Sequence, residues 1–146
     1  MTTTSQVVHS LLHELNTPLT VLVSAGAILK NKVPSTILDS IKQLDKISHQ
    51  LSQEAVALRA NLDEKIDLNS PTTAATQLRE LAASWQQYTV SLADALDQIQ
   101  ATEVQLKDPL LDKILNQSLV SGLDKLKNIL HRIETIQPQD LMKDEG

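Results

Sequence analysis

The sequence lacks cysteine and phenylalanine, and its aromatic content is very low. Without cysteine, the chain has no disulfide framework, no zinc site with thiolate ligands and no cysteine nucleophile. Trp85 and Tyr88 are the only aromatic side chains, so the core has to be built from leucine, isoleucine, valine and alanine. Aliphatic cores of this kind suit the packing of helices against helices.

Positive charge is also scarce, because 13 lysine and arginine residues face 18 aspartate and glutamate residues, which gives a formal net charge of -5. The sequence has neither the basic stripe nor the stacking aromatics that nucleic-acid binding requires. Its most apolar stretch, residues 18–29, is too short to span a bilayer, and no secretory signal is visible. We therefore expect a soluble, cytoplasmic protein with no nucleic-acid partner and no membrane partner.

Glycine is rare and scattered, so no glycine-rich loop can hold the phosphates of a nucleotide. The glycines are Gly26, Gly122 and Gly146. His13 and Glu14 begin a zinc-binding H-E-x-x-H pattern, but Thr17 occupies the place of its second histidine. We expect no metal and no cofactor bound by this chain.

Apolar residues recur at steps of three and four along four long segments, the spacing of a buried helix face. The first segment begins near Thr3 to Ser5 and runs to about Asn31, where a turn at Val33-Pro34-Ser35 follows. Ser70-Pro71 and Asp108-Pro109 each place an N-capping side chain before a proline, so the third and fourth helices begin there. Pro138 marks the end of the fourth helix.

These segments predict an all-α fold, an antiparallel up-down-up-down four-helix bundle built from two long helical hairpins. We expect one domain over residues 1–138, with hairpins at 1–66 and 71–138 and a flexible polar tail at 139–146. The expected core positions are Val8, Leu11, Leu12, Leu15, Leu19, Leu22 and Val23, then Ile37, Ile41, Leu44, Ser48, Leu51, Ala55, Leu58 and Leu62, then Leu78, Leu81, Trp85, Tyr88, Leu92, Ala95, Ile99 and Leu106, and finally Leu115, Leu119, Gly122, Leu126, Ile129, Ile133 and Ile136.

The run His13-Glu14-Leu15-Asn16-Thr17-Pro18-Leu19 stands out within the first helix. On a helical wheel, His13 and Thr17 lie on the same side and point away from the apolar stripe, towards water. Pro18 has no backbone donor and its ring crowds the carbonyl of Glu14, so we expect a kink about one turn after His13. A proline in a helix interior destabilises the helix by about 3 kcal/mol, so its presence here suggests a functional role.

This run resembles the H-box, the phosphoacceptor motif of the dimerisation and histidine-phosphotransfer (DHp) domain of bacterial sensor histidine kinases. The family pattern is His, Asp or Glu, an apolar residue, Arg or Lys, Thr, Pro and Leu after an apolar lead-in. The sequence departs from it at Asn16, where a basic residue is usual, and at Leu12, where a small polar residue is commoner. The resemblance implies that the nucleophile is Nε2 of His13, that Glu14 accepts a hydrogen bond from the ring, and that Thr17 orients water for dephosphorylating a partner.

A sensor kinase needs an α/β ATP-binding domain after this hairpin, and the helical pattern leaves none, so we expect no autokinase activity. The chain instead resembles a free-standing histidine-containing phosphotransfer protein of a two-component or phosphorelay system. It would exchange a phosphoryl group between His13 and the aspartate of a response-regulator receiver domain, which would carry the Mg²⁺. A sensor histidine kinase is a second candidate partner, and phosphatase activity a further option. Because the second hairpin can replace a partner's hairpin, a monomer is favoured over a homodimer.

Other interpretations stay open at this point. The chain could be a DHp-like binding module without chemistry that sequesters a receiver or modulates a kinase, or an unrelated helical scaffold. His13 could be an ordinary surface histidine and Glu14 a solvated carboxylate. The run Leu130-His131-Arg132-Ile133-Glu134-Thr135 echoes the motif but lacks the proline, so it is interpreted as coincidence.

A row beyond His13 is a candidate docking surface for the receiver, on the side of the helix opposite the core stripe. Its members are Val21, Ser24, Ala25 and Ile28. Alternatively, a kink at Pro18 rotates the second half of the helix and turns Val21 and Ile28 into the core.

Overall fold

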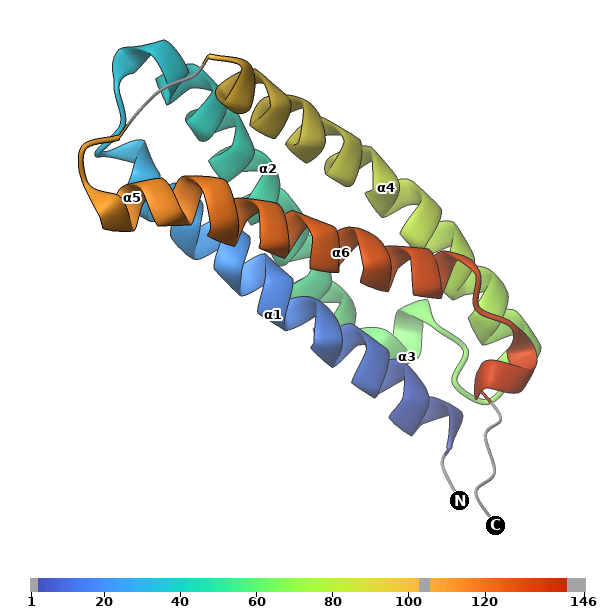
Figure 1. The fold of residues 1–146 in the computed structure, drawn as a ribbon. Helices are drawn as coiled ribbons and strands as arrows, with labels where there is room; N and C mark the ends of the chain where they lie inside the picture. The colour runs from blue at the N-terminus through green and yellow to red at the C-terminus, as the bar shows by residue number, and fades with distance from the viewer. Residues whose placement is uncertain (1–2, 103–105, 142–146) are drawn as a thin grey trace.

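The computed structural model describes residues 3–102 and 106–141, which form helices joined by turns and contain no strand (Figure 1). The all-α class is therefore confirmed. The helices are α1 (Thr4–Lys30), α2 (Ser35–Ala60), α3 (Leu62–Lys65), α4 (Pro71–Ala101), α5 (Pro109–Lys113) and α6 (Leu119–Glu134). A π-helical turn, Ile114–Ser118, joins α5 to α6, and a 3₁₀ turn, Pro138–Leu141, follows α6.

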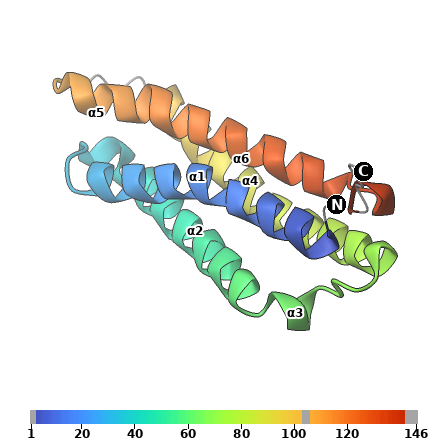
Figure 2. The ribbon, with the colours of Figure 1, turned by 90° about the horizontal axis from the view of Figure 1, so that it is seen from below.

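The long helices form a bundle around one apolar core. Seen from below, α1 lies between α2 and α6 (Figure 2), and α4 also packs against both of these helices. The start of α1 and the 3₁₀ turn after α6 lie at the same end of the bundle. Across the described residues, no helix combines the length and the apolar character that a membrane span requires.

The helix starts follow the capping signals in the sequence. At α1, the Thr3 hydroxyl accepts a hydrogen bond from the Gln6 backbone N–H, and the Gln6 side chain accepts one from the Thr3 N–H. This reciprocal capping box satisfies two donors that the first turn leaves free. Ser70 and Asp108 cap α4 and α5 in the predicted way, each with a proline at the next position.

The core consists of aliphatic side chains, with Trp85 as its one buried aromatic residue among those described. Every expected core position of the second and fourth segments is buried, which confirms both apolar seams. In the first and third segments the expected positions are buried except for five half-buried ones: Leu11, Val23, Leu81, Tyr88 and Leu106. The buried face therefore follows the helical period along nearly the whole chain.

The expectation of a flexible tail from residue 139 is wrong for residues 139–141. Pro138–Leu141 forms a 3₁₀ turn, and the side chain of Leu141 is completely buried. The Thr4 hydroxyl donates a hydrogen bond to the Leu141 carbonyl at 3.0 Å, which ties the turn to the start of α1. The side chain of Leu141 thus closes this end of the core. The rest of the expected tail, residues 142–146, lies outside the described part of the chain.

We expect Leu141→Ala to lower the free energy of unfolding by about 2 kcal/mol, because it opens a cavity at the end of the core. Urea denaturation monitored by circular dichroism measures this change. Leu110→Ala is the matched control, since Leu110 is 63% exposed and its truncation should cost less than about 0.5 kcal/mol. Equal stability of the two variants would contradict the packing of the C-terminal turn.

Two glycines allow α1 to lie close to its neighbours. A Cβ atom added at Gly26 of α1 would lie 2.9 Å from Oδ1 and 3.3 Å from Cα of Asp45 in α2. A Cβ atom added at Gly122 of α6 would lie 3.2 Å from Cγ1 of Val21 in α1. The first contact involves the backbone of α2, whereas the second involves only side chains, which can move. The α1–α2 contact therefore tolerates an added Cβ atom less well than the α1–α6 contact does.

We expect Gly26→Ala to be at least about 1 kcal/mol less stable than Gly122→Ala. Both changes gain about 1 kcal/mol of helix propensity, but overpacking against the Asp45 backbone costs roughly 1–3 kcal/mol at Gly26. Urea denaturation of the two variants under the same conditions gives the difference. A more stable Gly26→Ala variant would mean that α1 and α2 separate easily at this point.

Candidate functional site

α1 holds His13 on its outer side through the packing of its apolar residues. Leu12, Leu15 and Leu19 are at most 3% exposed, whereas His13 and Thr17 are both exposed. The predicted orientation of both side chains is therefore confirmed. Thr17 is one turn beyond His13 and lies on the same side of α1.

Pro18 does not end α1, which is continuous from Thr4 to Lys30. Its ring is buried. Because its nitrogen has no hydrogen, Pro18 cannot donate to the Glu14 carbonyl. The expected kink angle at this point stays a prediction, but the loss of one hydrogen bond in the turn after His13 follows from the sequence.

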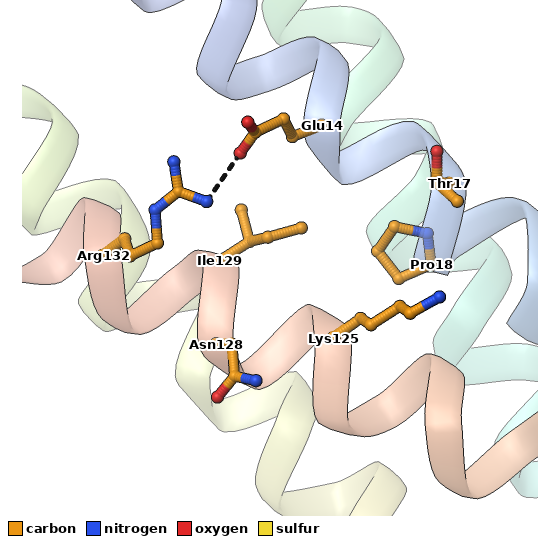
Figure 3. Close-up of a pocket in the computed structure, with 7 residues that line it drawn as sticks. All are labelled: Glu14, Thr17, Pro18, Lys125, Asn128, Ile129 and Arg132. Atoms are coloured by element: carbon orange, nitrogen blue, oxygen red, sulfur yellow. Dashed lines mark hydrogen bonds and ion pairs between the residues drawn. The ribbon is translucent and has the colours of Figure 1, made fainter.

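A groove runs between α1 and α6 next to this turn, with a volume of about 310 Å³ (Figure 3). Its lining residues are Glu14, Thr17, Pro18, Lys125, Asn128, Ile129 and Arg132. The buried side chains of Pro18 and Ile129 form an apolar floor, and the other members place charged or polar groups around it. Three of the residues named in the sequence motif thus meet a second helix here, while His13 stands outside the lining.

An ion pair crosses the groove from α6 to α1. Nη1 of Arg132 donates to Oε2 of Glu14 at 2.8 Å, and the two side chains are 57% and 42% exposed (Figure 3). The H-box resemblance assigned the Glu14 carboxylate to the His13 ring instead. Among the described residues, no hydrogen bond joins Glu14 to His13, so the structure corrects that assignment in this conformation.

Lys125, Asn128 and Arg132 are the site residues that sequence reasoning missed. Lys125 and Arg132 are seven positions apart, which places them two turns apart on the same face of α6. Arg132 belongs to the run dismissed as an echo of the motif. Their helical spacing was visible in the sequence, but only the packing of α6 against α1 identifies the residues they face.

Half of the expected docking row is wrong. Ala25 is 4% exposed and belongs to the core, and Val21 is half-buried against Gly122 of α6. Ser24 is exposed and Ile28 is 43% exposed, so these two remain available to a partner. The helical wheel placed one apolar stripe on α1, but α1 has two neighbours, and the face covered by both is wider than the stripe.

The remaining ionisable groups do not extend the site. Within residues 3–102 and 106–141, no three histidine, aspartate or glutamate side chains lie together as metal ligands would. His9 lines a separate polar groove near Arg59 and α3. On α4, a hydrogen bond with Glu54, together with burial and the charge of Glu54, raises the pKa of the Tyr88 hydroxyl above its ordinary value.

Comparisons with known proteins assign no family to this chain. No family model, no curated protein and no solved structure matches it. The function therefore has to be inferred from the residues of the site and their arrangement.

We expect the Glu14–Arg132 pair to contribute little to stability, because both side chains remain in contact with solvent. A double-mutant cycle with Glu14→Gln and Arg132→Gln should give a coupling free energy below about 1 kcal/mol, which decreases further at high salt. Unfolding in urea at low and high ionic strength measures it. The cycle of Glu14→Gln with Lys127→Gln is the control, and a coupling of several kcal/mol in the first cycle would show a buried pair.

Proposed function

We propose that this chain is a histidine-containing phosphotransfer protein of a two-component or phosphorelay system. It exchanges a phosphoryl group between His13 and the aspartate of a response-regulator receiver domain. The observation that carries the proposal is the exposed His13 in the middle of a long packed helix, with Glu14, Thr17 and Pro18 in H-box register beside a groove. An exposed imidazole on a rigid helix offers its nitrogen to a partner without a change of fold.

In the forward step, the neutral imidazole of His13 attacks the phosphorus of a receiver aspartyl phosphate through its Nε2 lone pair. The Nε2–P bond forms as the bond between phosphorus and the carboxylate oxygen breaks, and the aspartate leaves as a carboxylate. The proton on Nδ1 stays on the ring until it is released to solvent. A Mg²⁺ ion bound by the receiver would supply charge neutralisation for the oxygens of the transferred group.

The α1–α6 groove supports this assignment by the side chains it gathers. Asn16 stands where the H-box has a basic residue, but Lys125 and Arg132 of α6 bring positive charge to the Glu14 and Thr17 side of α1. Cationic donors favour a phosphoryl group that is being transferred. Thr17 is the residue that would orient water if the protein also dephosphorylates a partner, so phosphatase activity belongs to this proposal as a secondary activity.

We further propose that α1, α2, α4 and the α5–α6 segment form the bundle in an antiparallel up-down-up-down order. Short turns join α1 to α2, and each long helix packs against two others of the same chain. A bundle closed within one chain leaves no unpaired hairpin that a second copy would have to cover. We therefore infer that the protein acts as a monomer, and we further propose that it acts in the cytoplasm.

A binding module without chemistry is the alternative. The Glu14–Arg132 ion pair favours it, because the carboxylate that should assist the His13 ring is engaged elsewhere. Asn16 points in the same direction. Such a module would bind a receiver or a histidine kinase through α1 and leave His13 unmodified.

We expect His13→Gln to abolish phosphoryl acceptance from a phosphorylated receiver. The free energy of unfolding should change by less than about 0.5 kcal/mol, because His13 is exposed. Transfer of ³²P in the presence of Mg²⁺ measures acceptance, and the label should be acid-labile and base-stable, as phosphohistidine is.

His131→Gln is the matched control, since His131 is also an exposed histidine in a long helix. It should accept phosphate at the wild-type rate. Label that persists in His13→Gln would place the site elsewhere. Binding of the phosphorylated receiver with no label on the wild-type chain would favour the binding module.

A further inference from the structure

The ion pair between Glu14 and Arg132 brings a cation close to the turn that carries His13. Glu14 follows His13 directly, so their Cα atoms are about 3.8 Å apart. Arg132 contacts Glu14 through one nitrogen only, and the guanidinium has five N–H donors in all. Its side chain is 57% exposed, so it is free to change partner without disturbing the core.

His13 does not line the groove, but it lies on a side of α1 that carries a residue which does. Thr17 lines the groove, and it lies on the same side of α1 as His13, one turn further along. Lys125 lines the same groove beside Thr17 and Pro18, and no ion pair of Lys125 occurs among the described residues. Two further ionisable residues of α1 lie near His13 in the sequence. His9 is one turn before His13, and Glu14 directly follows His13.

We propose that phosphorylation of His13 moves Arg132 from the Glu14 carboxylate to the phosphoryl group, so that the α1–α6 ion pair is a switch. The inference rests on the proposed function, because it requires a phosphoryl group on His13. A phosphoryl group carries about two negative charges and three acceptor oxygens, whereas a carboxylate carries one charge. The guanidinium can form paired hydrogen bonds with either group, and the larger charge makes the phosphoryl group the stronger competitor.

The exchange changes the surface that a partner meets. Without phosphate, Arg132 bridges the groove and neutralises Glu14. With phosphate, Glu14 loses its cation and repels the neighbouring phosphoryl group, while Arg132 turns towards the outer side of α1. A partner that contacts α1 next to His13 can therefore distinguish the two states by the position of one guanidinium group.

The test uses the full chain phosphorylated on His13 by phosphoramidate, a small phosphoryl donor that requires no protein partner. A ³¹P NMR titration then gives the pKa of the phosphoryl group. We expect Arg132→Gln to raise that pKa by about one unit relative to the wild type, because a cation in contact favours the dianion. The Nε–Hε resonance of Arg132 should also shift when the wild type is phosphorylated.

Lys127→Gln is the matched control, because it removes one positive charge from the same helix but lines the groove that faces α4. It should leave the phosphoryl pKa unchanged. Glu14→Gln, which keeps Arg132 and removes its competitor, should retain the low pKa. A phosphorylated wild type whose pKa equals that of Arg132→Gln, or equal shifts in Arg132→Gln and Lys127→Gln, would overturn the switch alone. A wild type that takes up no phosphoryl group on His13 from either phosphoramidate or a phosphorylated receiver would overturn the proposed function with it.

Discussion

The rotation of α1 about its own axis is the constraint on which both the bundle and the site depend. Leu12, Leu15 and Leu19 have to face the core, and each residue along a helix turns by about 100°. Once these leucines are buried, the helical geometry places His13 and Thr17 on the outer side of α1. The accessibility of the histidine is thus set by the packing of its neighbours, and a rotation of α1 that moved His13 to the position of Leu12 would bury it.

The closeness of α1 to its two neighbours explains which charges reach the site. Gly122 lets α6 approach Val21, and from this contact α6 continues past Pro18 and Glu14 towards its C-terminal end. Lys125 and Arg132 therefore arrive beside α1, although the chain as a whole has a net charge of -5. The same approach covers Val21. The contact that supplies the cations thereby removes part of the surface that the sequence suggested for docking.

The features that could be predicted from the sequence are those set by local chemistry. Thr3, Ser70 and Asp108 cap their helices through residues two or three positions away, and the seams repeat with the helical period. Contacts between residues far apart in the sequence could not be predicted in this way. Arg132 lies 118 positions from Glu14, and no periodicity connects them. Leu141 and its neighbour Met142 are too few to form a periodic apolar pattern, so the sequence does not predict the burial of Leu141.

The energetic cost of Pro18 inside α1 is partly offset by the packing of the bundle. In an isolated helix interior it would cost about 3 kcal/mol, chiefly because the Glu14 carbonyl loses its donor and the ring crowds that turn. In the bundle its buried ring forms the groove floor with Ile129, and the apolar surface removed from water offsets part of that cost. The packing of α1 against α2 and α6 holds the helix together on both sides of the missing hydrogen bond. A proline at this place therefore weakens the backbone only in the turn from Glu14 to Pro18, directly after His13.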